Sequence, residues 1–360
     1  MTVFVPKTYD PSKISNVEVV LGAAAYDSNN PNCGPSRSIL TGNISSELFS
    51  VGIQTSLNRI YVFPDYEGPK AAFQQTNVAA TSVLDGLRAL LHFTTIIPAN
   101  LKDKVKIGLE GYSNGGHAIA WSLQKLKTYA PELEKYIVGA SIGGVPANVT
   151  QVGQSEDGTR IAGFILLSLF GQAKVDKRFE NWIEKHGNAS QIKKAKQYTE
   201  KLCIDSVLKP FAGQKIWEKY FNLQTSQVYG DPSLPFSEGI LATQKEGQEI
   251  KIPIFLYHSV QDQFVPISVA DEYESRLCSG KSTSLQYIRS TTEKHLGMQI
   301  VQISYSALFL QGQFTGKGIS KGCQRSDKAL KLDDPTNVAV FGNATISALS
   351  QLLQLARSEE

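Results

Sequence analysis

Short apolar runs alternate with helical patterns along most of the chain, and this alternation constrains the fold more than any other feature. Strands that alternate with helices predict an α/β fold class, with a mostly parallel sheet and helices on both faces. The strand-like runs are Val17–Leu21, Ile60–Phe63, Val105–Leu109, Ile137–Ile142, Ile252–Tyr257 and Leu285–Ile288. The helical stripes are Ala71–His92, Ala118–Leu126 and Val269–Leu277.

The stretch from Pro146 to Gly247 breaks this rhythm, because it has few strand-like runs. We therefore expect residues 146–250 to form a helical cap inserted into a core of residues 1–145 and 251–360. Ordinary sheet-covering helices are the alternative. The expected helical segments lie around Phe179–Lys185, Ile192–Leu202 and Ile216–Phe221, and a turn-rich section covers residues 229–235.

Composition excludes several classes of protein. The chain has 360 residues, of which 41% are hydrophobic and 19% charged, which is enough apolar content for a sizeable core. Its 36 Lys and Arg against 33 Asp and Glu give a net charge of +3 with no basic block, so we expect no nucleic-acid partner. The longest apolar runs, such as Ile161–Phe170, are too short for a bilayer span, so no transmembrane anchor is expected.

A candidate nucleophile lies in Gly111-Tyr-Ser-Asn-Gly, a Gly-x-Ser-x-Gly motif centred on Ser113. A serine lifted out of a sheet on a sharp strand-to-helix turn crowds the positions two before and two after it, so glycine is favoured at both. Ser113 follows a strand-like run and precedes a helical one. The same spacing recurs around Ser320, but between polar runs, so we interpret Ser320 as a chance match.

The acid and the base are expected downstream, in the order nucleophile, acid, histidine. Asp262 follows the strand-like run Ile252–Tyr257, where it would orient a histidine. His295 follows the next run and would take the Ser113 proton. Asp271 and Glu272 are alternative acids within a predicted helix. The other histidines are His92, His117, His186 and His258, and we expect structural roles for His117 and His258.

An oxyanion site needs two hydrogen-bond donors. The backbone N–H of Asn114, directly after the nucleophile, is expected to be one of them. The second should come from a loop after an earlier strand, and Tyr61–Pro69 is the candidate, with the N–H of Asp65 preferred. A plain turn is the alternative interpretation of that loop.

Four cysteines without a Cys-x-x-Cys pair permit three disulfide pairings. Together with four glycosylation sequons they favour the secretory pathway. The cysteines are Cys33, Cys203, Cys278 and Cys323, and the sequon asparagines are Asn43, Asn148, Asn188 and Asn343. By contrast, the start Met1-Thr-Val-Phe-Val-Pro has neither the basic nor the apolar region of a signal peptide. It predicts either a protein that is not exported or a chain that begins downstream of the true start.

Several motifs, in their order along most of the chain, resemble those of the fungal secretory lipase family. The matching segments are Pro64-Asp-Tyr-Glu-Gly-Pro, Leu84-Asp-Gly-Leu-Arg-Ala, Gly111-Tyr-Ser-Asn-Gly-Gly, Asp262-Gln-Phe-Val-Pro and His295-Leu-Gly. The resemblance implies an α/β-hydrolase with a helical cap, a secreted monomer that hydrolyses acylglycerols and simpler esters at a lipid–water interface. Family members usually have a signal peptide and early core strands upstream of the position of Thr2, so the resemblance predicts that this sequence is a truncated or degenerate copy.

The resemblance also implies roles for individual residues. Ser113, Asp262 and His295 carry over as the catalytic triad, and Asp65 and Asn114 as the oxyanion positions. Disulfides Cys33–Cys203 and Cys278–Cys323 are implied, whereas no metal or organic cofactor is. A short-chain carboxylesterase and a truncated non-catalytic relative are the alternatives.

Overall fold

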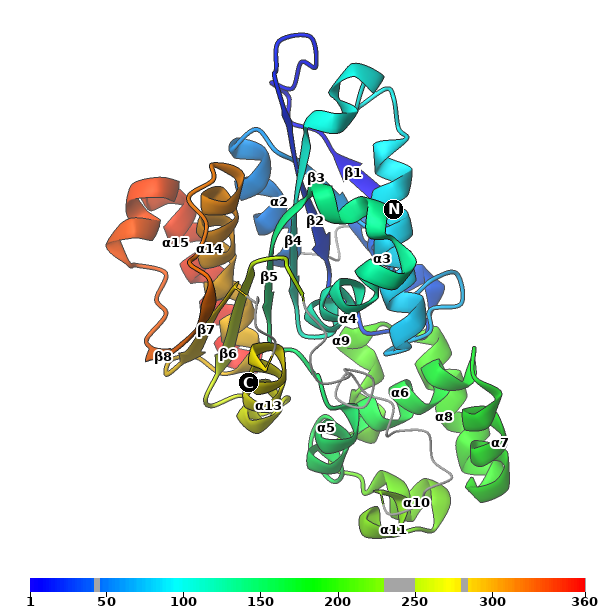
Figure 1. Cartoon of the computed structure of the whole chain (residues 1–360). Helices are drawn as coiled ribbons and strands as arrows, with labels where there is room; N and C mark the ends of the chain where they lie inside the picture. The colour runs from blue at the N-terminus through cyan, green and yellow to red at the C-terminus, as the bar shows by residue number, and fades with distance from the viewer. Residues whose placement is uncertain (42–45, 230–249, 280–283, 360) are drawn as a thin grey trace.

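Eight strands form one sheet in the computed structural model of the chain, which describes residues 1–41, 46–229, 250–279 and 284–359 (Figure 1). Their order is β1-β3-β2-β4-β5-β6-β7-β8, and every neighbouring pair is parallel except β1 with β3. The mostly parallel sheet that the sequence predicted is therefore confirmed. The strands are β1 Thr2–Phe4, β2 Val17–Ala23, β3 Ile60–Phe63, β4 Val105–Tyr112, β5 Ile137–Gly143, β6 Ile254–Ser259, β7 Ser284–Ser290 and β8 Gly322–Lys328.

Helices cover both faces of the sheet. Apolar side chains of α3, α4 and α13 pack on one face in the largest hydrophobic cluster, and those of α2, α14 and α15 pack on the other (Figure 1). This two-sided burial explains why the central strands read as continuous apolar runs. The helices of this part are α1 Pro35–Thr41, α2 Ser46–Ser56, α3 Thr76–Leu91, α4 Asn114–Tyr129, α13 Ile267–Cys278, α14 His295–Phe314 and α15 Pro335–Glu359.

The expected helix Ala71–His92 is corrected at its start. Helix α3 begins only at Thr76, because Ala71 and Gln74 have positive φ angles of 47° and 56°, which a right-handed helix does not allow. The Gln75 side chain accepts a hydrogen bond from the Val78 N–H and caps the helix there. Residues 64–75 therefore form a loop beyond β3.

The segment between β5 and β6 carries seven α-helices in its described part. Many of their buried side chains form a hydrophobic cluster of their own, which includes Trp182, Trp217 and Phe221. The turn-rich section predicted at 229–235 lies outside the described residues beyond Tyr229. The helices are α5 Val149–Glu156, α6 Gly163–Ala173, α7 Lys177–His186, α8 Ala189–Lys201, α9 Ile204–Val207, α10 Ile216–Phe221 and α11 Thr225–Tyr229.

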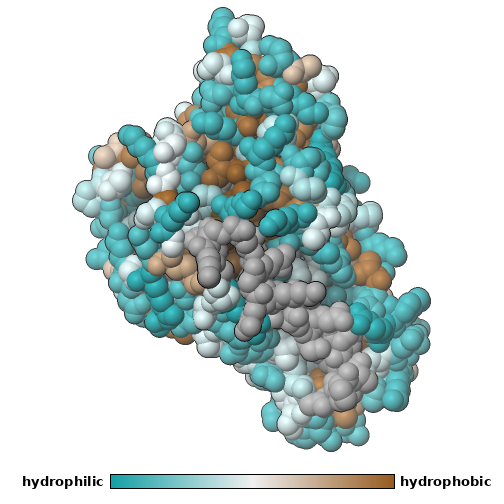
Figure 2. Space-filling model, viewed as in Figure 1, coloured by the Kyte–Doolittle hydropathy of each residue, from teal (hydrophilic) through white to brown (hydrophobic). Residues whose placement is uncertain are grey.

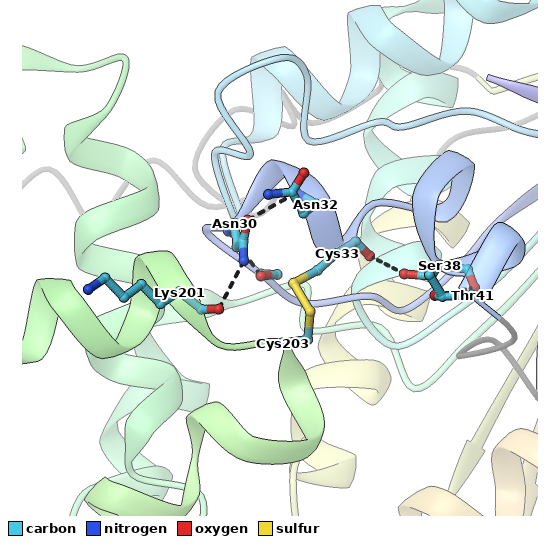
Figure 3. Close-up of a disulfide and its surroundings, with 8 residues drawn as sticks. Asn30, Asn32, Cys33, Ser38, Thr41, Lys201 and Cys203 are labelled. Carbon is cyan, nitrogen blue, oxygen red and sulfur yellow. Dashed lines mark hydrogen bonds between the residues drawn. A yellow bond between two sulfur atoms is a disulfide. The ribbon is translucent and has the colours of Figure 1, made fainter.

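A disulfide between Cys33 and Cys203 joins these helices to the loop that follows β2 (Figure 3). Beside it the Asn30 side chain donates a 3.0 Å hydrogen bond to the carbonyl of Lys201. The second disulfide joins Cys278 at the end of α13 to Cys323 in β8. Both pairings are those that the family resemblance implies.

The sequon asparagines have different environments. Asn148 and Asn188 cap α5 and α8 through their side-chain oxygens, and Asn343 is exposed within α15. Asn43 lies outside the described residues. The surface seen in Figure 2 is mainly hydrophilic, with hydrophobic side chains showing in the upper part of the face.

Helix α15 is, within the described ranges, the one helix long and apolar enough to cross a membrane by length and composition. It also packs on the sheet layer, because Ile346, Leu349 and Leu353 are buried in the cluster that α14 shares. Gly342, with φ 78°, interrupts its helical geometry.

Candidate active site

Ser113 lies on the sharp turn between β4 and α4. Its φ of 53° and ψ of −125° are strained for a residue with a side chain. The flanking glycines permit this turn: a Cβ on Gly111 would lie 2.5 Å from the Gly115 carbonyl oxygen, and one on Gly115 would lie 1.9 Å from the Ala23 oxygen. The Gly-x-Ser-x-Gly spacing therefore has the steric origin expected from the sequence.

Three predicted residues meet at the carboxyl ends of their strands. The Nε2 atom of His295 lies 3.0 Å from the Ser113 Oγ, and its Nδ1 lies 2.7 Å from the Asp262 Oδ2. The other carboxylate oxygen of Asp262 accepts the backbone N–H groups of Phe264 and Val265, at 2.9 and 2.8 Å. These contacts fix the carboxylate and place the imidazole between it and the hydroxyl.

The Asp262–His295 pair is shielded from water. The Asp262 side chain has no exposed surface, and 3% of that of His295 is exposed. Burial acts to raise the pKa of Asp262, but the charge and hydrogen bond of His295 outweigh it and hold that pKa below its usual value. Asp262 thus stays ionised. The Phe264 ring stacks on the imidazole at 4.8 Å, and the Tyr112 hydroxyl donates to the His295 carbonyl at 2.8 Å.

The alternative acids have other partners. Asp271 accepts from the Tyr287 hydroxyl at 2.9 Å and pairs with Arg325 at 2.8 Å. Glu272 pairs with Arg276 on its own helix at 3.0 Å. Neither arrangement brings a carboxylate to the imidazole of His295.

The remaining histidines also have structural environments. His117 is buried beside Trp121, and burial lowers its pKa to about 3, so it stays neutral. His258 is buried, with its Nε2 atom 2.8 Å from the Val265 carbonyl. His92 ends α3, and His186 stacks on Trp182. His295 is the histidine that contacts Ser113.

Ser320 lies between α14 and β8, so its motif runs from helix to strand, the reverse of the Ser113 turn. It is exposed, and its hydroxyl accepts a hydrogen bond from the Gln324 side chain at 3.0 Å. This is the environment of a surface loop residue.

The side chain of Asn114 is buried and held by the loop that follows β3. Its amide donates to the Tyr66 hydroxyl at 3.1 Å and to the Glu67 carboxyl at 3.0 Å. The Tyr66 hydroxyl in turn donates to the Ala24 carbonyl at 2.7 Å. The start of α4 is thereby tied to the loops of two other strands.

Asp65 belongs to the same loop but faces elsewhere. Its carboxylate accepts the Ser36 N–H at 2.9 Å and pairs with the amino terminus at 2.9 Å. Strand β3, which leads to it, is separated from β4 by β2. The loop after β2 therefore lies next to the Ser113 turn, one strand closer than the loop of Asp65.

Asp27, in the loop after β2, was not predicted from the sequence as a site residue. It is 7% exposed, has a positive φ of 36°, and interacts with the Asn114 side chain and with the charge of His295. Its Oδ1 atom is buried without a hydrogen-bond partner in the described structure. Burial raises the pKa of Asp27 to about 7, although the His295 charge acts in the opposite direction. The one feature of the sequence that could have indicated Asp27 is its position shortly after a buried strand.

Two further carboxyls lie near Asp27. Burial and the charge of Asp27 raise the pKa values of Glu67 and Glu156 well above the usual value. Burial thus acts against the ionised form of all three groups. In the described ranges no group of three or more His, Cys, Asp or Glu residues could hold a metal ion.

Ser113, Asp262 and His295, in this chain order at the carboxyl ends of β4, β6 and β7, define the class of the fold as an α/β-hydrolase. Residues 37–322 match the family model described as secretory lipase. The chain belongs to this secretory lipase family.

Proteins of similar sequence and a solved structure of similar fold support this family membership. Lipase 5 of Candida albicans is 28% identical, over 98% of this chain and 76% of that protein. The secreted triacylglycerol lipase LIP5 of Malassezia furfur is 28% identical, over 96% of this chain and 89% of that protein. The X-ray structure of Candida antarctica lipase A in its closed state superposes with a TM-score of 0.82 at 26% identity, covering 96% of this chain and 81% of that one. The chain is a lipase-type ester hydrolase.

Proposed function

We propose that the protein is a triacylglycerol lipase that works through an acyl-enzyme on Ser113. The observation that supports this most is the placement of the His295 imidazole between the Ser113 hydroxyl at 3.0 Å and the Asp262 carboxylate at 2.7 Å. This arrangement suits the activation of a serine toward an ester carbonyl.

In the proposed reaction, His295 Nε2 takes the hydroxyl proton while Ser113 Oγ attacks the carbonyl carbon. The imidazolium then gives the proton to the departing alcohol, and an ester of Ser113 remains. Water, deprotonated by the same nitrogen, attacks that ester. The bond between the acyl carbon and Ser113 Oγ then breaks, the imidazolium returns the proton to Oγ, and the fatty acid is released. Asp262 stays ionised throughout, holds Nδ1–H and stabilises the imidazolium.

The oxyanion of each tetrahedral intermediate would be held by the backbone N–H of Asn114 and by the loop after β2. We assign the second position to Asp27 in place of Asp65, because β2 is the strand that pairs with β4. Below a pH of about 7 the Asp27 carboxyl is neutral, and its unpaired oxygen can donate a hydrogen bond to the developing charge.

The helices between β5 and β6 would act as a cap over the site, so that residues 1–145 and 251–360 form the catalytic core. Phe164 of α6 supports this, since its ring contacts Phe264, which stacks on His295. We also propose an extracellular location, with glycosylation at the exposed Asn188 and Asn343. Two disulfides and the secreted relatives support that location.

Substrate comparison tests the function. The lipase proposal predicts greater hydrolysis of an emulsified long-chain triglyceride than of p-nitrophenyl butyrate in solution. Wild type and a Ser113→Ala variant would be compared by titration of released acid and by p-nitrophenol release. Activity confined to the soluble butyrate would make the protein a short-chain carboxylesterase. A folded wild type with no more activity than Ser113→Ala would refute ester hydrolysis through this serine.

A further inference from the structure

The loop that leads into His295 contains a residue in a strained backbone conformation. Glu293, two residues before His295, has a φ of 56°, in the left-handed region that residues with side chains rarely adopt. Such a conformation persists in a protein only where the surrounding contacts hold it. The contacts of Glu293 therefore bear on where the imidazole of His295 lies.

The backbone of this loop is tied to the segment that carries Asp262. The Ser259 hydroxyl, at the end of β6, donates a hydrogen bond to the carbonyl of Glu293. The N–H of His295 donates to the side-chain oxygen of Gln263 at 3.2 Å. These two contacts hold the loop from the side of the proposed acid.

The carboxylate of Glu293 is held by the C-terminal helix, α15, which packs alongside α14 (Figure 1). Arg357, in the last turn of α15, donates through Nε to Glu293 Oε2 at 2.8 Å and through its second nitrogen to Oε1. A bidentate arginine–carboxylate contact is among the strongest and most directional ion pairs in proteins. The Glu293 side chain is 8% exposed and that of Arg357 is 54% exposed, so a buried carboxylate is held by an arginine at the surface.

Gly297, the glycine of the His295-Leu-Gly motif, leaves room for this carboxylate. A Cβ on Gly297 would lie 2.7 Å from Glu293 Oε2 and 3.3 Å from the Cδ1 atom of Leu353 in α15. The Glu293 side chain thus folds back onto the first turn of α14, which begins at His295. The glycine of the motif, which the triad roles leave unexplained, has a steric reason in this contact.

We propose that the ion pair between Arg357 and Glu293 positions His295, so that the C-terminal helix contributes to the active site. The inference rests on the proposed role of His295 as the base that activates Ser113. The pair holds the strained loop, and the loop sets the distance from the imidazole to the Ser113 hydroxyl. Because a misplacement of about 1 Å can cost on the order of 100-fold in rate, a loosened loop should lower kcat. Arg357 is a positioning residue that acts through Glu293.

The test measures kcat and KM on p-nitrophenyl butyrate, together with the rate at which a fluorophosphonate labels Ser113. Arg357→Met removes the charge and the donors but keeps a long side chain. We expect it to lower kcat and the labelling rate on the order of 10-fold, with KM within about 2-fold of wild type. Arg357→Lys keeps the charge without the planar fork and should recover part of the loss.

Two further measurements separate positioning from general stability. Glu293→Ala should lower kcat as well, and the double variant Glu293→Ala/Arg357→Met should be no slower than Glu293→Ala alone, because the two residues act as a unit. Methylguanidinium chloride should partly restore kcat in Arg357→Ala, since the arginine side chain is half exposed, whereas sodium chloride at the same concentration should not. Arg276→Met removes an exposed 3.0 Å pair with Glu272 on α13, and this matched control should leave kcat unchanged.

Each outcome distinguishes this inference from the proposed function. Equal kcat values and labelling rates in Arg357→Met and wild type, even with a lower melting temperature, would give the pair a structural role only. That result would overturn the inference and leave ester hydrolysis at Ser113 intact. Losses that multiply in the double variant would overturn it too, because the two residues would then act independently. A folded wild type that is neither labelled nor active would refute the proposed function and the inference together.

Discussion

The side-chain amide of Asn114 donates a 3.0 Å hydrogen bond to the carboxyl of Glu67. The contact joins the residue directly after Ser113, the proposed nucleophile, to the loop beyond β3, with both side chains buried. It ties the first turn of α4, which carries the proposed oxyanion N–H, to that loop. We therefore expect Glu67 to act as a positioning residue through Asn114.

Replacing Glu67 tests this role. Glu67→Ala should lower kcat on the order of 10-fold with little change in KM, because the N–H of Asn114 would lose its fixed direction in the transition state. Glu67→Gln keeps an acceptor of the same shape and should recover most of the activity. Steady-state kinetics on p-nitrophenyl butyrate would show both effects. Equal kcat values for Glu67→Ala and wild type would contradict the positioning role of Glu67.

The pH profile tests Asp27. Its carboxyl loses its proton as the pH rises through about 7, and with the proton it loses the ability to donate to an oxyanion. We therefore expect kcat to fall above this pH in the wild type. Asp27→Asn carries an amide that donates at every pH, so the fall should disappear or move to higher pH. Asp27→Ala should lose on the order of 100-fold in kcat at pH 6. Profiles of the same shape in Asp27→Asn and wild type would argue against this donor.

The tight approach of Gly115 to β2 gives a steric prediction. Because a Cβ there would lie 1.9 Å from the Ala23 carbonyl oxygen, Gly115→Ala must displace backbone and distort the Ser113 turn. We expect a loss of several kcal/mol in unfolding free energy or no soluble protein. Urea unfolding would measure it. Gly52→Ala is the control, since nothing lies within 4 Å of its added Cβ.

The strands that carry Ser113, Asp262 and His295 could be predicted because their signals are local. Short apolar runs identify β4, β6 and β7, and the chain order of the motifs assigns the candidates. Strand β8 could not be found this way, because its residues Gly322–Lys328 are polar and exposed. Asp27 was missed for a different reason. Its place beside Ser113 follows from the strand order β3-β2-β4, which the local sequence pattern does not encode.

The two disulfides should differ in their contributions to stability. Cys33–Cys203 closes a sequence separation of 170 residues and Cys278–Cys323 one of 45, so loop entropy favours the first by about 1 kcal/mol. Replacing either pair with serine should cost about 2–4 kcal/mol in unfolding free energy. Chemical denaturation of each double variant would measure the cost. If neither double variant lost stability, the result would contradict a stabilising role for the two disulfides.

The central claim is that Ser113 is the nucleophile of an ester hydrolase. The most direct measurement is labelling of the folded protein with a fluorophosphonate, followed by mass spectrometry of its peptides, in wild type, Ser113→Ala and Ser320→Ala. We expect a single label on Ser113 in wild type and Ser320→Ala. In Ser113→Ala we expect neither label nor p-nitrophenyl butyrate hydrolysis above background. Label on another serine, or activity retained in Ser113→Ala, would contradict it.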